Sequence, residues 1–188
     1  MRPTRLALAL ALAAAAPLSA QSAARTGFTL SLGVGGGSAG VSCGDSCTSD
    51  RETSPSMYLR LGGAVRPNLV LAGEINGWSK SENGGTFTIG TVNAVAQYYP
   101  AASNGFYLLG GLGFGTMEAK ADLGGGFTAS DRANGLGYQL GAGYDWRLAP
   151  TFALTPYVGY FSTVGGKFSD GTQANGNVVQ FGLGFTWR

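Results

Sequence analysis

The sequence contains no histidine, and this absence excludes more chemistry than any other feature of the chain. Histidine is the base in Ser-His-Asp and Cys-His nucleophilic sites, and it is a common nitrogen ligand of metal ions. No other group in the sequence replaces it in these roles. We therefore expect no enzyme activity, no cofactor and no metal site.

Charged residues are scarce, at 12% of the chain, with 12 Lys and Arg against 10 Asp and Glu. Arg2 and Arg5 precede an apolar run over residues 6–16, which is the order of a secretory signal peptide. We expect residues 1–20 to be this signal and residues 21–188 to form one domain. Removing the two arginines leaves ten basic against ten acidic residues (12 − 2 = 10), so the charge balance gives no reason to expect nucleic-acid binding.

Long hydrophobic runs are also missing. No segment after residue 20 has the roughly 18 uninterrupted apolar residues that indicate a transmembrane helix. Glycine is abundant, with 33 residues, but the aromatic content of 11% argues against a disordered chain. Any structure of this chain that crosses a membrane must therefore be a closed β-sheet.

The C-terminal residues 177–188 alternate between two faces with a period of two, which predicts a β-strand. One face carries Val179, Phe181, Leu183, Phe185 and Trp187, and the other carries Val178, Gln180, Gly182, Gly184, Thr186 and Arg188. Similar apolar faces occur in residues 27–35 and 134–147. The chain offers no second layer to cover them, so we expect lipid to be the cover, with Phe185 and Trp187 at the periplasmic interface.

Seven connections of two alternating kinds divide the chain into eight strands. The short ones contain a proline and lie at 66–68, 100–105 and 149–151, whereas the long ones are polar or glycine-rich and lie at 36–53, 79–85, 120–133 and 165–176. The expected strands are residues 27–35, 56–65, 69–78, 86–99, 106–119, 134–147, 152–164 and 177–187. This pattern predicts an all-β fold, an eight-stranded antiparallel up-and-down transmembrane barrel with short periplasmic turns and longer extracellular loops.

The turn at Pro67 fixes a register between the second and third strands, in which Leu59 faces Ile75 and Arg60 faces Glu74. The two charged residues then lie on the inward face as a cross-strand ion pair. An enclosed charge is costly unless it is paired, so each residue accounts for the other. We expect this pair to help plug the lumen.

The chain resembles the small eight-stranded outer-membrane barrels of Gram-negative bacteria, the group of the OmpA transmembrane domain and OmpX. The resemblance covers the chain after the signal and implies a monomer in the outer membrane, with the lipid bilayer and lipopolysaccharide as partners. The aromatic C-terminal strand is similar to the signal read by the barrel-assembly machinery. Arg188 after Trp187 departs from this pattern, and we expect it to reach periplasmic water.

Two short motifs lie near the first long connection. Cys43 and Cys47 are the only cysteines, and they can form a small disulfide, part of a thiolate metal site with Asp45 or Asp50, or two free thiols. Gly35, Gly37 and Gly40 match G-x-G-x-x-G, but a dinucleotide site needs a helix directly afterwards, and a loop composition follows. We expect the disulfide and an ordinary loop.

Two functions fit this architecture. The first is a structural or surface-interaction barrel whose lumen is filled by side chains, as expected for eight strands. The second is a narrow channel or a conduit for small apolar solutes, as in the OmpW-like group, for which the many inward glycines would leave room. Acidic residues outnumber basic ones at the long-loop end. This end can bind the divalent cations of lipopolysaccharide, can bind a basic host surface, or is an ordinary solvated rim. The sequence does not indicate an external ligand.

Overall fold

The computed structural model describes residues 25–43, 50–82, 84–122 and 128–188. The expected signal peptide, residues 1–20, lies outside these ranges and stays a prediction. The described residues include no helix with the length and apolar character needed to cross a membrane. The strands are β1 (Gly27–Ser42), β2 (Glu52–Arg66), β3 (Leu69–Glu82), β4 (Gly85–Tyr98), β5 (Phe106–Asp122), β6 (Thr128–Tyr144), β7 (Trp146–Ala149), β8 (Phe152–Lys167) and β9 (Gln173–Trp187).

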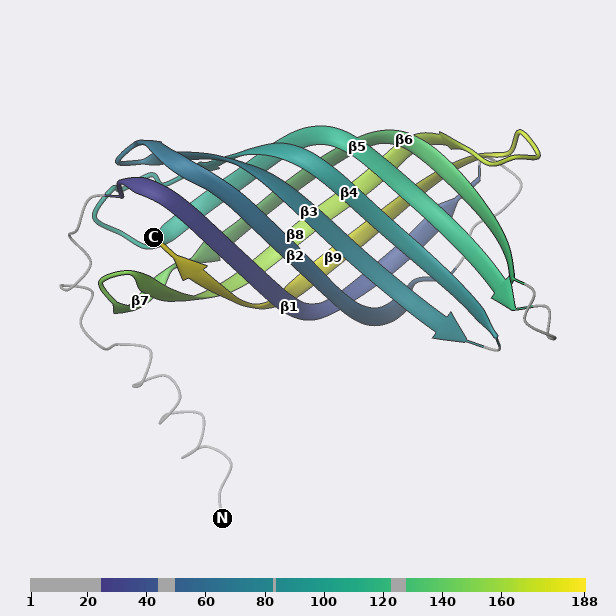
Figure 1. Cartoon of the computed structure of the whole chain (residues 1–188), viewed down its shortest axis with the longest axis horizontal. Coiled ribbons are helices and arrows are strands. Elements are labelled where there is room, and N and C mark those ends of the chain that lie inside the picture. The colour runs from purple at the N-terminus through teal and green to yellow at the C-terminus, as the bar shows by residue number, and fades with distance from the viewer. Residues whose placement is uncertain (1–24, 44–49, 83, 123–127) are drawn as a thin grey trace, which may run out of the picture.

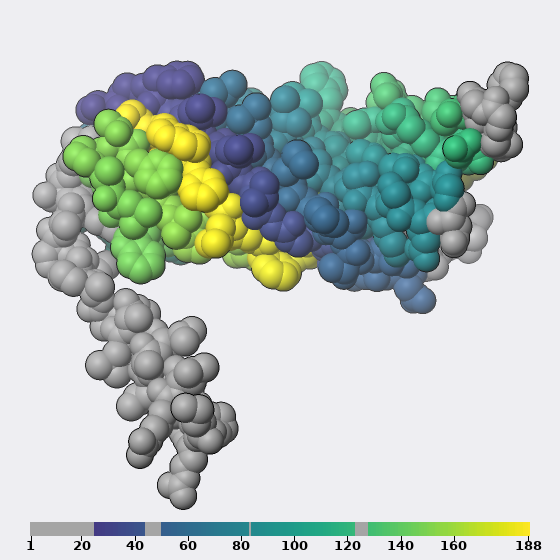
Figure 2. All heavy atoms as spheres, turned by 60° about the horizontal axis from the view of Figure 1, so that its bottom comes forward, coloured from purple at the N-terminus to yellow at the C-terminus, as the bar shows by residue number. Residues whose placement is uncertain are grey.

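The sheet closes on itself as an antiparallel barrel (Figure 1). Neighbouring strands pair in chain order, β9 pairs with β1, and β8 pairs with both β6 and β7. β6 and β7 are therefore one strand interrupted at Asp145, which confirms the predicted eight-stranded barrel. In the space-filling view the first and last strands lie against each other along the closing seam (Figure 2).

The two ends of the barrel differ as the proline positions predict. The short turns and the C-terminus lie at one end, together with the start of β1, and the longer connections lie at the other (Figure 1). These are the periplasmic and extracellular ends of an up-and-down outer-membrane barrel.

The outer wall carries an apolar band around its middle and its periplasmic part. Its members are exposed side chains at alternate positions of all eight strands, such as Leu32, Leu59, Ile75, Val92, Phe114, Leu140, Val158 and Phe181. At the periplasmic edge, the ring of Phe152 lies 5.9 Å from that of Phe185 and 5.3 Å from that of Trp187. The predicted apolar faces of the first, sixth and last strands all belong to this band.

The strands extend further at the extracellular end than the sequence predicts. β1 continues to Ser42, so the loop expected around Gly37 and Gly40 is wrong, and both glycines lie in a strand. Beyond the apolar band the two faces exchange character: Trp78, Ile89 and Met117 are buried inside, whereas their chain neighbours on the outer face are glycine or polar residues. This exchange interrupts the alternation, and the sequence therefore suggested loops where strands continue.

Candidate functional site

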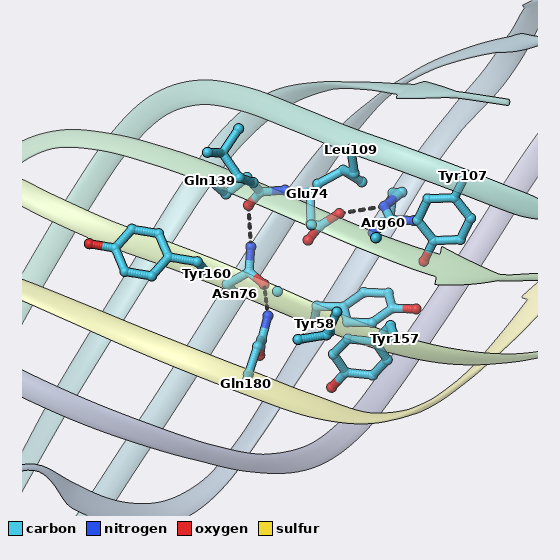
Figure 3. A pocket seen from close by; sticks show the side chains of 15 residues that line it. Tyr58, Arg60, Glu74, Asn76, Tyr107, Leu109, Gln139, Tyr157, Tyr160 and Gln180 are labelled. Atoms are coloured by element: carbon cyan, nitrogen blue, oxygen red, sulfur yellow. Dashed lines mark hydrogen bonds and ion pairs between the residues drawn. The ribbon is translucent and has the colours of Figure 1, made fainter. Parts of the chain in front are cut away.

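The lumen is the candidate site, and its centre is built around Arg60 and Glu74. β2 and β3 pair in the predicted register, with Arg60 opposite Glu74 and Leu59 opposite Ile75. Arg60 is 4% exposed and Glu74 is 3% exposed, and the Arg60 Nε donates to the Glu74 carboxylate (Figure 3). The Arg60 Nη1 also donates to the Gln97 Oε1, at 3.2 Å. The structure thus brings the two expected lumen residues together as a buried ion pair.

Three tyrosines surround this pair inside the barrel. The guanidinium carbon of Arg60 lies 4.9 Å from the ring centroid of Tyr58 and 5.8 Å from that of Tyr107. Tyr157 meets Tyr58 edge to face, with 4.8 Å between the ring centroids. The cavity that remains among these side chains has a volume of about 20 Å³, which is space for about one water molecule.

Amide side chains from four strands cross the lumen on the extracellular side of the ion pair, and Figure 3 shows those of Asn76, Gln139 and Gln180. Asn76 donates to the Gln139 Oε1 at 2.5 Å and accepts from the Gln180 Nε2 at 2.9 Å. Asn93 donates to the same Gln139 oxygen at 2.9 Å. Gln180, on the small and mildly polar face of the last strand, thus takes part in the crossing network through its amide.

A second charged pair closes the periplasmic end. Arg188 pairs with the buried carboxylate of Asp145, which also accepts from the Tyr99 hydroxyl at 2.6 Å and from the Thr155 hydroxyl at 2.9 Å. Gln97 donates to the Tyr99 hydroxyl at 2.6 Å, so the network continues to Arg60. The expectation that Arg188 reaches periplasmic water is wrong: its side chain turns inward and is 12% exposed.

Arg25 covers this periplasmic end from the segment before β1. Its guanidinium carbon lies 3.4 Å from the ring centroid of Tyr99, and its Nη1 donates to the carbonyl oxygen of Ala102 at 2.8 Å. The side chain is buried. The turn between β4 and β5 and the segment before β1 are thereby tied together under the lumen.

An apolar layer closes the extracellular part of the lumen. Its buried members are Ala39, Trp78, Ile89, Met117, Ala133, Phe161, Ala174 and Val178. The Trp78 indole Nε1 donates to the carbonyl oxygen of Gly37 at 2.9 Å, so its polar atom has a partner. We call this set the outer layer.

A depression of about 480 Å³ lies above the outer layer at the extracellular mouth. Its floor includes Val41, Trp78 and Phe87. Around it, Lys80 forms ion pairs with Glu52 and Glu82. This depression joins an apolar floor to a charged rim on the surface that faces outward from the cell.

The other predicted site is only partly visible. Cys43 follows β1 and packs against the outer layer, whereas Cys47 lies outside the described residues. The Cys43–Cys47 bridge therefore stays a prediction. Among the described residues, no group of three or more Cys, Asp and Glu side chains is placed to hold a metal ion.

Sequence reasoning missed the periplasmic pair and the outer layer. Asp145 was visible as an inward residue in the alternation of the sixth strand, but its partner Arg188 lies 43 positions away. No turn fixes the register between these two residues, as Pro67 does for Arg60 and Glu74. The outer layer could not be predicted because, at the edge of the apolar band, the apolar side chains change from the outer to the inner face of the strands.

Comparisons with known proteins agree with this architecture. The model of the outer membrane protein β-barrel domain family matches residues 6–188. Ail, the attachment invasion locus protein of Yersinia pestis, solved in complex with the heparin analogue sucrose octasulfate, has 18% identity and a TM-score of 0.60, over 85% of this chain and 99% of Ail. Neisserial surface protein A has 17% identity and a TM-score of 0.59, over 88% of this chain and 99% of that protein. No curated protein matches the chain in sequence. The closed barrel, its lipid-facing band and the family match together place this protein in the outer membrane of a Gram-negative bacterium, and the chain belongs to the outer membrane protein β-barrel family.

Proposed function

We propose that this protein is a structural or surface-interaction barrel whose lumen passes no solute, and that its extracellular end is the surface through which it acts. No catalytic step is part of the proposal, because the sequence has no histidine to act as a base. The protein is expected to work as a monomer that contacts lipopolysaccharide through its outer wall.

The observation that carries the proposal is the stacking of three closures along the lumen. The outer layer is apolar, the middle contains the Arg60–Glu74 pair and the amide network, and the periplasmic end contains the Asp145–Arg188 pair. The cavity in the middle has a volume of only about 20 Å³. A solute would have to displace all three sets, and separating the two side chains of either buried ion pair would leave buried charges without partners.

Conductance in a planar lipid bilayer tests the proposal. We expect the refolded wild-type barrel to insert without unitary openings. Because any one closure is enough to block the lumen, Arg60→Ala alone is expected to stay closed, and so is Trp78→Ala with Phe161→Ala. Stable openings are expected only when the substitutions that remove the middle and outer closures are combined with Arg188→Ala, which removes the periplasmic closure.

Leu59→Ala with Ile75→Ala is the matched control for the middle closure. These two residues are cross-strand partners one position away from Arg60 and Glu74, and they face lipid. The control should insert and stay silent. Unitary openings of the wild-type barrel would overturn the proposal and favour the alternative, a narrow channel or a conduit for small apolar solutes.

A further inference from the structure

A groove of about 410 Å³ runs across the outer wall of the barrel, at the extracellular edge of the apolar band. The lining side chains on the outer face are Ile75, Val92, Phe114, Thr116, Arg132 and Asn134, and Gly90 contributes only backbone. The groove lies on the lipid-facing surface and is separate from the lumen. It is therefore independent of whether the lumen is closed.

The strand register explains why a groove forms at this place. Ile75, Val92 and Phe114 are successive partners across β3, β4 and β5, and they form an apolar ridge in which Phe114 is 80% exposed. The next row towards the outside is made of Gly77, Gly90 and Thr116, which leave a trough beside that ridge.

The far wall of the groove is cationic. Arg132 and Lys120 both pair with the carboxylate of Glu118, at 2.9 Å and 3.3 Å. The hydrogen bond from Arg132, followed by that from Lys120, lowers the pKa of Glu118, which lies beyond the apolar band, so the carboxyl is ionised at neutral pH. Two cations thus share one anion, and the trio has one net positive charge.

Arg132 keeps hydrogen-bonding capacity for a ligand. Its side chain is 58% exposed, and among the contacts of the described residues Glu118 occupies only the Nη2 of its donors. The Thr116 hydroxyl, beside the groove, is buried and has no hydrogen-bond partner among the described residues. A guanidinium binds phosphate oxygens through several donors at once.

We propose that this groove binds a lipid that carries both acyl chains and phosphate, the chemistry of the lipid A part of lipopolysaccharide. An acyl chain would lie in the trough against Val92 and Phe114, and a phosphate would lie against Arg132. The occupant is a lipid of the outer leaflet, because the groove lies at the extracellular edge of the band. The cation next to it is complementary to a phosphate, whereas a lipid without an anionic group would leave it unused.

Native mass spectrometry of protein extracted from mixed vesicles tests this site. The vesicles contain phosphatidylcholine with either diphosphorylated lipid A or the same lipid with its phosphates removed. We expect the wild type to retain the phosphorylated lipid about tenfold more than Arg132→Gln does, which is the size of effect of one charged hydrogen-bonding partner. The dephosphorylated lipid should be retained by the wild type as weakly as the phosphorylated lipid is by the variant.

A second variant tests the trough itself. Gly90→Val fills it, since a Cβ at this position meets the Thr116 methyl at 3.6 Å and the Asn76 carbonyl oxygen at 3.3 Å, and we expect about tenfold lower retention. Gly73→Val is the matched control, because a Cβ there has no atom within 4 Å and the position lies outside the groove. Arg51→Gln, next to β1 and β9, is the control for the charge.

Each result of this experiment decides the proposal. It is overturned if Arg132→Gln and Gly90→Val retain as much phosphorylated lipid A as the wild type, if both controls lose as much as the variants, or if inorganic phosphate alone displaces the lipid. A closed lumen and an empty groove can occur together, so this failure is distinguishable from a failure of the conductance experiment. Correct folding of every variant is checked by the gel migration of unboiled samples.

Discussion

Removing one partner of the Arg60–Glu74 pair should destabilise the barrel far more than removing one partner of a surface pair. Both side chains are almost completely buried, and breaking a buried pair typically costs about 3–5 kcal/mol of the free energy of unfolding. In Glu74→Gln, Arg60 keeps its bond to Gln97 and the faces of Tyr58 and Tyr107. We expect this variant at the lower end, about 3 kcal/mol.

The reverse substitution should be more costly. Among the described residues, the Glu74 carboxylate has Arg60 as its ion-pair partner and no second cation. Arg60→Gln therefore leaves a buried anion and is expected at about 5 kcal/mol. Arg60→Leu with Glu74→Leu removes both charges, so the double variant should lose less free energy of unfolding than the two single variants together. We expect a loss of about 2 kcal/mol, because the Gln97 oxygen is left without a donor.

Urea unfolding of the barrel in phosphatidylcholine vesicles, followed by the gel migration of unboiled samples, measures these free energies. Glu52→Gln is the matched control, since Glu52 pairs with Lys80 at the exposed rim and such a pair contributes at most about 1 kcal/mol. The reasoning is refuted if Glu74→Gln costs no more than Glu52→Gln. It is also refuted if the double variant costs the sum of the single ones, because the two charges would then not depend on each other.

Two further predictions concern the closing seam and the first loop. Gly35→Ala places a Cβ 2.0 Å from the Phe181 carbonyl oxygen, so we expect β1 and β9 to fail to pair and the barrel to stay open. Gly73→Ala is the control and should fold, because a Cβ there has no atom within 4 Å. The heat-modifiable fraction on a gel distinguishes the two variants. For the expected Cys43–Cys47 disulfide, mass spectrometry after alkylation should find no modified thiol without reductant and two with it; two modified thiols without reductant would exclude the bridge.

The barrel could be predicted from the sequence because lipid imposes one rule on every strand. An outward side chain in the bilayer must be apolar, so the alternation in residues 134–147 and 177–187 shows the facing directly. Arg60 could be paired with Glu74 because the turn at Pro67 is short and fixes the register. In both cases, residues close together in the sequence were sufficient for the prediction.

The rest of the lumen could not be predicted, because it depends on which residues meet across the barrel. Gln180 bonds to Asn76, 104 positions away, and Arg188 bonds to Tyr99, 89 positions away. Alternation says that such residues point inward, but not at which depth they lie or which partner they reach. Beyond the apolar band even the facing was obscured, because water replaces lipid outside and the polar face becomes the outer one.

The contacts inside the barrel change the interpretation of the inward glycines. In the sequence they suggest free space for a conduit, but at Gly33 and Gly143 large side chains from neighbouring strands occupy that space. A Cβ on Gly33 would lie 2.1 Å from the ring of Tyr58, and a Cβ on Gly143 would lie 2.4 Å from the hydroxyl of Tyr107. Glycine is needed at these positions because each tyrosine folds over the backbone of the glycine paired with it on the adjacent strand. Interior glycine in a small barrel therefore indicates an open lumen only where no aromatic residue of comparable depth faces it, and here Tyr58 and Tyr107 both do.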